Sequence, residues 1–299
     1  MKKMLFIMNP YAGQRKAAKN LTQIMEVFNR GGYGVTVYMT AGPGDGEKAA
    51  REMAAGHDLV VCCGGDGTFN EAAAGVLAAG VDVPLGYIPA GSTNDFASSL
   101  GLSLDNLQAA RDVVEGEPVA VDAGMFGSRF FSYVASFGAF TRASYATPQS
   151  MKNTLGHTAY ILSGIAEIAQ LKTENVHITL SDGTLLEGPF IFGAVSNSTS
   201  VAGILTLAPD RVDMCDGKLE VMLIRAPKNL AELGEIISAL QKQTYNCSAM
   251  TFLSTERLSV TADERMDWSL DGERQEGVSQ VEITCLHKAI RILRRRKET

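Results

Sequence analysis

The first 116 residues alternate between short apolar runs and longer segments in which apolar residues recur at helical spacing. The run at 58–63, "DLVVCC", is almost uninterruptedly apolar, which is typical of a strand buried on both faces of a parallel sheet. Strand–helix alternation at this spacing predicts a parallel sheet covered by helices on both faces. The expected strands are 3–8, 33–39, 58–63 and 84–89, and the expected helices are 16–32, 45–56, 70–80, 94–101 and 104–116.

The pattern changes after Gly116, where short runs of strand residues are separated by turn signals. This spacing predicts a mainly antiparallel β-sandwich as a second domain, interrupted by one helix at 155–172. We therefore expect a nucleotide-binding α/β domain at 1–116 and a sandwich at 117–286, with 287–299 as a candidate to return to the first domain. The expected strands include 175–180, 181–186, 189–197, 218–224, 257–262, 266–270 and 281–285.

Composition excludes several classes of protein. A net charge of −6 gives no support for a nucleic-acid binder. The basic run 288–297 is expected to be a solvated tail, with attraction to phosphate or an anionic membrane surface as the alternative. Five cysteines form no CxxC pair, which indicates a reducing cytosol, and no apolar run reaches the length of a transmembrane span. We expect a cytoplasmic protein that meets lipid from the water side.

Five Asp-Gly dipeptides occur, and each one alone is most simply a hairpin turn. Asp66 differs because "LVVCC" precedes it and "NEAAAGV" follows it, so that it lies between a strand and a helix. Glycines at the end of a strand leave backbone N–H groups uncovered, and the next helix directs its positive end to the same place. The sequence therefore predicts a phosphate-binding loop at "GGDGTFNE".

Two further glycine-bearing loops follow expected strands. "NPYAG", Asn9 to Gly13, comes after the first strand, and "PAGSTNDF", Pro89 to Phe96, comes after the fourth. The carboxyl ends of parallel strands share one edge of the sheet, where open α/β folds bind ligands. No GxxxxGK[ST] sequence is present, which excludes a Walker-type site.

These three loops resemble those of the diacylglycerol kinase catalytic domain family, which includes bacterial lipid kinases and, more distantly, sphingosine and ceramide kinases. The resemblance continues as "CDGKLEV" at 215–221 and "LDGE" at 270–273, so it spans nearly the whole chain. GGDGT alone is less specific, because NAD kinases and 6-phosphofructokinases share it. The resemblance implies a Rossmann-like nucleotide domain, a β-sandwich domain and an active site in the cleft between them.

The resemblance also implies roles for single residues. Asp271 would be the general base on a lipid hydroxyl, with Glu273 beside it, and Asp66 would serve the metal near the phosphates. Mg²⁺ would bind the carboxylate of Asp216 and the main-chain carbonyls of Asp213 and Lys218. Ser92 stands where the family usually has threonine. The implied ATP-binding residues are Asn9, Pro10, Gly13, Thr40, Gly64, Gly65, Asp66, Gly67, Thr68, Asn70, Glu71, Ser92, Asn94 and Asp95.

Four departures from the family pattern leave alternatives open. Ser98 replaces a frequent arginine, Gln14 a frequent lysine and Cys215 a common aspartate, and the turn before Cys215 is one residue longer. One alternative is a nucleotide-binding regulator that has lost catalysis, and another is a kinase of a soluble acceptor such as NAD. Plain hairpin turns at Asp216 and Asp271 remain the simpler alternative for those residues. Nothing in the sequence distinguishes one lipid acceptor from another, and a homodimer through a sheet edge stays an open question.

Overall fold

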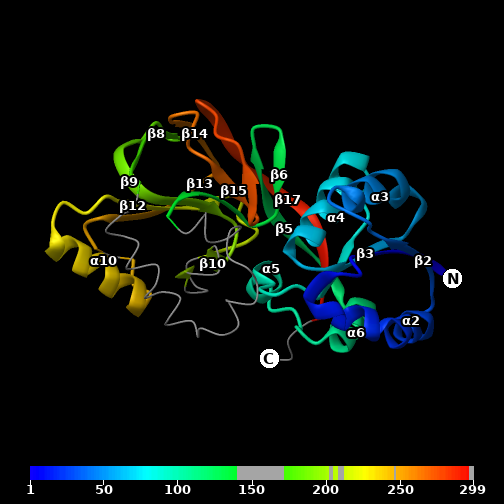
Figure 1. The fold of residues 1–299 in the computed structure, drawn as a ribbon. Helices are drawn as coiled ribbons and strands as arrows, with labels where there is room; N and C mark the ends of the chain where they lie inside the picture. The colour runs from blue at the N-terminus through cyan, green and yellow to red at the C-terminus, as the bar shows by residue number, and fades with distance from the viewer. Residues whose placement is uncertain (140–171, 202–204, 208–211, 246, 296–299) are drawn as a thin grey trace. The chain divides into compact units, whose positions relative to one another are not determined.

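The computed structural model describes the whole chain except residues 140–171, 202–204, 208–211, 246 and 296–299. The described chain forms two compact units (Figure 1). The first contains Met1–Ala123 together with His287–Thr299, and the second contains Gly124–Leu286. Two strands, β5 (Glu117–Phe126) and β17 (Gln280–Arg294), run through the boundaries between the units.

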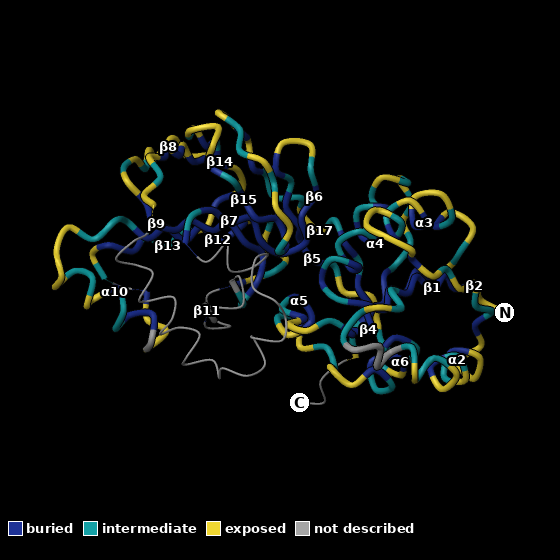
Figure 2. The backbone as a smooth tube through the Cα atoms, viewed as in Figure 1, coloured by how far each residue is buried: buried dark blue, intermediate teal, exposed yellow. Residues whose placement is uncertain are grey.

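The first unit is built on a parallel sheet in the order β2-β1-β3-β4, with the end of β17 beside β4. The register places the carboxyl ends of the strands level, because Met8 pairs with both Met39 and Cys63, and Gly64 pairs with Pro89. Strands β3 and β4 are buried at every residue (Figure 2). The four strands are β1 (Lys2–Met8), β2 (Tyr33–Met39), β3 (Leu59–Gly64) and β4 (Leu85–Pro89).

Helices cover both faces of this sheet because each has one apolar side. Ile24 and Phe28 of α2 pack with Phe6 of β1, and Ala110 and Val113 of α6 belong to the same core. Helices α3 and α4 pack against each other and against β1 and β3 on the opposite side of the sheet (Figure 1). The helices are η1 (Ala12–Arg15), α1 (Lys16–Lys19), α2 (Leu21–Arg30), α3 (Asp45–Met53), η2 (Ala54–Gly56), α4 (Asp66–Ala79), α5 (Asp95–Ser99) and α6 (Asn106–Glu115).

The second unit is antiparallel, in the order β16-β15-β7-β9-β8-β14-β17, and β9 also pairs with β12, which pairs with β13. Its core contains Trp268, whose ring meets Phe126 and Phe137 edge to face. The remaining elements are β6 (Arg129–Phe131), β7 (Val134–Gly138), β8 (Glu174–Leu180), β9 (Leu185–Ser196), β10 (Ser200–Val201), β11 (Leu205–Thr206), β12 (Leu219–Arg225), α10 (Leu230–Lys242), β13 (Met250–Thr255), β14 (Arg257–Thr261), β15 (Trp268–Leu270) and β16 (Glu273–Gln275).

The structure differs from the sequence-based expectations in several places. Helix α4 begins at Asp66 rather than at Asn70, so the Asp-Gly of the glycine-rich loop already forms the first helical turn. The basic run is not a solvated tail up to Arg294: it continues β17, where Ile290 and Ile292 are buried. Helix α10 and strand β13 were not expected. The expected helix at 155–172 lies outside the described residues, except for Lys172.

Within the part of the chain that the structure describes, the helices are all too short or too polar to span a bilayer.

Candidate active site

The three glycine-bearing loops meet at the carboxyl edge of the parallel sheet in the first unit. The N–H of Asn9, just past β1, donates to the carbonyl oxygen of Cys63 at 2.9 Å. Gly13 has φ of +48°, and a Cβ atom there would overlap the carbonyl oxygen of Ala90 in the third loop. A Cβ atom at Gly91 would come within 2.6 Å of the Cα of Gly65. At Gly13 and Gly91 the backbones of different loops therefore come so close that there is room for a hydrogen atom but not for a Cβ atom.

Asp66 organises the third loop. Its buried carboxylate accepts the N–H of Asp95 at 3.0 Å and the N–H of Phe96 at 3.4 Å. The hydroxyls of Tyr87 and Thr93 donate to the same carboxylate at 3.3 and 3.5 Å. These contacts join the start of α4 to the start of α5, so Asp66 holds the segment 93–96 in place beside Gly64, Gly65 and Gly67.

Asn94 and Ser92 differ in how the structure places them. Asn94 is buried with φ of +52°, and its side chain bridges back to Gly91: Oδ1 accepts the Gly91 N–H at 2.9 Å and Nδ2 donates to the Gly91 carbonyl at 3.1 Å. Such a side-chain bridge fixes the turn. Ser92 is exposed at the tip of this turn. The loop thus presents a hydroxyl from a backbone that is held by Asn94 and Asp66.

Thr40 and Glu71 extend the site along the same sheet edge. The N–H of Thr40 donates to the carbonyl oxygen of Met8 at 2.9 Å, which continues the pairing of β2 with β1. Glu71 lies in the second turn of α4, and its carboxylate accepts the backbone N–H groups of Gly44 and Gly46 at 2.7 and 2.9 Å. Pro10, Gly67 and Asn70 are partly exposed, whereas Gly64 and Thr68 are buried.

Asp271 lies in the second unit, in the hairpin turn between β15 and β16, with φ of +50°. Its carboxylate accepts four hydrogen bonds from the segment 132–134. The N–H and the hydroxyl of Ser132 donate to Oδ2 at 2.6 and 2.7 Å. The N–H groups of Tyr133 and Val134 donate to Oδ1 at 3.0 and 2.9 Å. Burial raises the pKa of Asp271, and the four donors partly offset that rise because they stabilise the ionised form.

Glu273 occupies a different environment in the same hairpin. Its side chain is exposed and forms an ion pair with Arg129, with 2.8 Å between Arg129 Nη2 and Glu273 Oε2. The hairpin therefore carries one carboxylate that is buried and fixed by backbone donors, and one that is exposed and paired with a cation.

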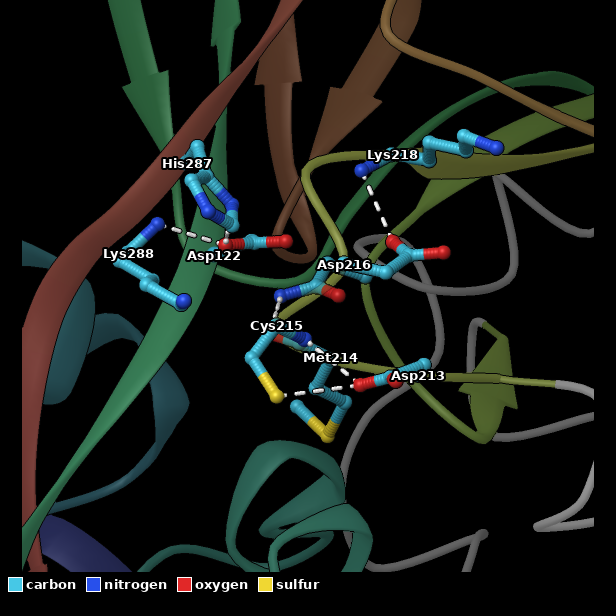
Figure 3. Close-up of polar contacts among 9 residues, drawn as sticks. Asp122, Asp213, Met214, Cys215, Asp216, Lys218, His287 and Lys288 are labelled. Carbon is cyan, nitrogen blue, oxygen red and sulfur yellow. Dashed lines mark hydrogen bonds and ion pairs between the residues drawn. The ribbon is translucent and has the colours of Figure 1, made fainter.

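The expected metal-binding turn is exposed and closed by its own side chains (Figure 3). Oδ1 of Asp216 accepts the N–H of Lys218 at 2.9 Å. Oδ1 of Asp213 accepts the N–H of Cys215 at 3.1 Å, and the Cys215 thiol donates to the same oxygen at 3.1 Å. In the described part of the chain no three His, Cys, Asp or Glu side chains gather as a metal cluster. One carboxylate with main-chain carbonyls and water is nevertheless a donor set that suits Mg²⁺, because all of the donors are oxygen.

One buried carboxylate was not singled out from the sequence. Asp122 has no exposed surface, and its Oδ1 accepts the N–H of Lys288 at 2.6 Å and contacts Nδ1 of His287 at 3.0 Å (Figure 3). All three residues belong to the first unit. The signal in the sequence was a lone aspartate within the strand "PVAVDAGMF", a position where an unpaired charge would be costly.

Comparison with known proteins identifies the family of the chain. Residues 3–126 match the model of the diacylglycerol kinase catalytic domain, and residues 134–294 match the YegS C-terminal NAD kinase beta sandwich-like domain. A diacylglycerol kinase of Bacillus subtilis is 33% identical over 98% of this chain and 96% of its own length. The chain belongs to the diacylglycerol kinase family.

A second relative agrees with this assignment, and a solved structure agrees with the fold. A diacylglycerol kinase of Staphylococcus saprophyticus is 30% identical over 91% of this chain and 89% of its own length. The crystal structure of a putative diacylglycerol kinase from Bacillus anthracis superposes with a TM-score of 0.81, covering 98% of this chain and 95% of that chain at 24% identity. The expected fold class is confirmed: a parallel α/β domain is followed by a β-sandwich-like domain.

Proposed function

We propose that this protein is an ATP-dependent lipid kinase that transfers the γ-phosphate of ATP to a hydroxyl group of a lipid such as diacylglycerol. The observation that carries the proposal is the meeting of three glycine-bearing loops at the carboxyl edge of the parallel sheet, beside the N-terminus of α4. Backbone N–H groups and a helix N-terminus at such an edge favour phosphate. The lipid acceptor is supported by the family to which the chain belongs.

The first unit supplies the groups that bind the nucleotide. Asn9, Gly13 and the segment 64–70 would lie along the phosphates of ATP, Thr40 beside the nucleotide, and Ser92 would offer a hydroxyl. Asp66 keeps the third loop in register with the second through the contacts described above. Phosphoryl transfer requires mainly positioning and neutralisation of charge, which backbone donors can provide.

Mg²⁺ would be held by the carboxylate of Asp216 and the main-chain carbonyls of Asp213 and Lys218. The exposed turn that these residues form offers only oxygen donors from those groups, in keeping with the preference of the ion. Bound Mg²⁺ supplies positive charge that offsets the charge of the phosphates.

The second unit supplies the base. An alcohol is a weak nucleophile at neutral pH, so a carboxylate that accepts its proton as the new O–P bond forms assists the reaction. Asp271 would take this proton while the bond between the γ-phosphorus and the bridging oxygen breaks and ADP leaves. Its raised pKa moves it towards the range of an effective base. Glu273, exposed in the same hairpin and paired with Arg129, would lie beside this base.

Transfer of labelled phosphate tests the proposal. The purified protein is incubated with γ-labelled ATP and Mg²⁺, in separate tubes with vesicles that contain diacylglycerol, phosphatidylglycerol, ceramide, a sphingoid base or a polyprenol. Further tubes contain NAD or no acceptor. We expect label in a lipid, with diacylglycerol the most rapidly labelled. Label in NAD alone would make the protein a kinase of a soluble acceptor, and ATP binding without label anywhere would make it a regulator.

The role of Asp66 has its own test. Asp66→Ala removes the acceptor of four hydrogen bonds at the junction of two phosphate-binding loops, so we expect the KM for Mg²⁺–ATP to rise by about tenfold or more. Steady-state kinetics at several magnesium concentrations measures this. Asp82→Asn, at an exposed carboxylate, is the control. An unchanged dependence on Mg²⁺–ATP would remove Asp66 from the site.

A further inference from the structure

The glutamate that ends "GGDGTFNE" is already engaged by the protein. Glu71 reaches from α4 to the start of α3, where Oε1 accepts the N–H of Gly44 at 2.7 Å and Oε2 accepts the N–H of Gly46 at 2.9 Å. Gly44 is the N-cap residue of α3, so these two N–H groups are among those that the helix itself leaves unsatisfied. Both carboxylate oxygens therefore serve helix α3.

The charge of Glu71 also argues against a direct contact with phosphate. A carboxylate beside the phosphates of ATP would repel them, whereas a carboxylate at a helix N-terminus is stabilised by the positive end of the helix dipole. Glu71 takes the second arrangement. Glu71 in the glycine-rich motif thus binds the backbone of another loop, at Gly44 and Gly46.

The loop that Glu71 holds begins at Thr40. Oδ2 of Asp45 accepts the N–H groups of Ala41 and Gly42 at 2.7 and 3.0 Å, which closes the segment 41–45 into a turn. Glu71 fastens the far end of that turn to α4. Thr40 itself is anchored to β1 through Met8. Glu71 therefore adds a side-chain link between this loop and α4, whose first turn begins at Asp66, to the packing of α3 on α4.

The packing at this point leaves no room for a side chain unless Glu71 moves. Gly46 is buried, and a Cβ atom there would lie 2.7 Å from Oε2 of Glu71 and 3.2 Å from its Cβ. Gly56, in η2 outside this loop, has no atom within 4 Å of such a Cβ position. The two glycines give a matched pair: an added methyl group disturbs the contact with Glu71 at one of them and not at the other.

We infer that Glu71 is a positioning residue that couples the phosphate-binding loop at the start of α4 to the nucleotide-side loop 40–46, and that it sets the affinity for ATP without touching it. The part of this inference that concerns ATP rests on the proposed function. The hydrogen bonds of Glu71 to Gly44 and Gly46 are present in the protein without nucleotide. It replaces the direct ATP contact that the family resemblance suggests for Glu71.

Kinetics of two variants tests the inference. Glu71→Ala removes both acceptors, and Glu71→Gln keeps one acceptor oxygen but places an amide group against the other N–H. We expect the KM for ATP to rise by about tenfold in Glu71→Gln and by more in Glu71→Ala, with kcat and the KM for lipid changed by less than about threefold. Glu47→Gln, at an exposed carboxylate of α3, is the control and should match the wild type.

A double-mutant cycle tests whether Glu71 changes the KM for ATP through its contact with Gly46. Gly46→Ala should raise the KM for ATP in the wild type, and Gly56→Ala, outside the loop, should not. In the Glu71→Ala background, Gly46→Ala should add little, because the carboxylate that it displaces is gone. Fully additive effects would show that Gly46 and Glu71 act separately and would overturn the coupling.

Amide hydrogen exchange without nucleotide separates this inference from the proposed function. We expect exchange in 41–46 to accelerate by about tenfold or more in Glu71→Ala, while exchange in β1 is unchanged. If the wild type labels no lipid, the proposed function fails, and calorimetric ATP binding by the same variants still decides the inference. Unchanged exchange in 41–46, or a fall in kcat with an unchanged KM for ATP, would overturn it.

Discussion

Two hairpins of the second unit turn at the same dipeptide, yet their aspartates have opposite surroundings. Asp182-Gly183 connects β8 to β9, and Asp271-Gly272 connects β15 to β16. The glycines have nearly the same φ, +85° and +87°. Asp182 is exposed and only caps its own turn, by accepting the N–H of Thr184 at 2.9 Å. Asp271 is buried and accepts four hydrogen bonds from 132–134.

The difference appears in the direction of the pKa shifts. A backbone hydrogen bond from Thr184 lowers the pKa of Asp182, whereas burial raises the pKa of Asp271. The dipeptide therefore determines the turn, and the surroundings determine what the carboxylate can do. A buried carboxylate with a raised pKa binds a proton more readily and is suited to proton transfer. An exposed carboxylate with a lowered pKa is a weaker base and is not.

The largest contrast is expected in catalysis. Asp271→Asn replaces the proposed base by an amide that cannot accept the proton of the alcohol, so we expect kcat to fall by about 10²- to 10⁴-fold. The amide also places N–H groups against backbone donors, which lowers stability. Labelled phosphate transfer measures kcat, and calorimetric ATP binding should stay within a few-fold. Near-normal turnover in Asp271→Asn would make its turn as structural as that of Asp182, and Glu273→Gln would then be the variant to assay.

The pH dependence sharpens the same contrast. Because burial raises the pKa of Asp271, its base form is lost at a higher pH than that of an ordinary aspartate. We expect kcat/KM to fall by about tenfold per pH unit on the acid side, with a midpoint above the usual aspartate value. A midpoint at or below that value in the pH profile would contradict the assignment.

Stability should depend on pH in opposite directions at the two sites. A raised native pKa contributes stability that is present below the unfolded-state pKa and is lost as pH rises through the native pKa. The contribution of Asp271 therefore decreases with rising pH, whereas that of Asp182, whose pKa is lowered, is lost as pH falls. Urea unfolding of each Asp→Asn variant beside the wild type, at several pH values, gives the sign.

Some of the strands and turns could be predicted from the sequence, whereas the burial of Asp271 could not. Strands β3 and β4 could be predicted because parallel strands that are buried on both faces are apolar at almost every residue. The hairpin at Asp182 was predicted from Asp-Gly, whereas the hairpin at Asp271 was the alternative left open for that residue. The burial of Asp271 could not be predicted, because its donors lie 137–139 residues away in the chain.

The same limit applies to the first unit. Glu71 contacts residues 25 and 27 positions earlier, and only the packing of α3 on α4 brings them together. Asp122 was overlooked because its partners lie at the other end of the chain. Helix α10 was not predicted although its segment carries helix signals: Asn229 caps its first turn, and apolar residues recur at 233, 236, 237 and 240.

Substitutions at the two hairpin glycines, Gly183 and Gly272, should reduce protein stability equally but activity unequally. Both occupy a left-handed region that L-residues adopt with strain, so Gly183→Ala and Gly272→Ala should each lower the free energy of unfolding by about 1–2 kcal/mol. Only Gly272→Ala should also lower kcat, because it displaces the neighbouring Asp271. Urea unfolding and phosphate transfer on both variants measure the pair. Equal losses of activity would show that the hairpins do not differ in function.

The smallest effect is expected at Asp182. Asp182→Asn keeps an oxygen that can accept the N–H of Thr184, and the side chain remains in water. We expect almost no change in the free energy of unfolding and an unchanged kcat. Because the variant makes the same chemical change as Asp271→Asn in the same dipeptide, it isolates the surroundings as the cause of any difference. A large loss of activity at Asp182 would mean that the exposed hairpin also takes part in the reaction.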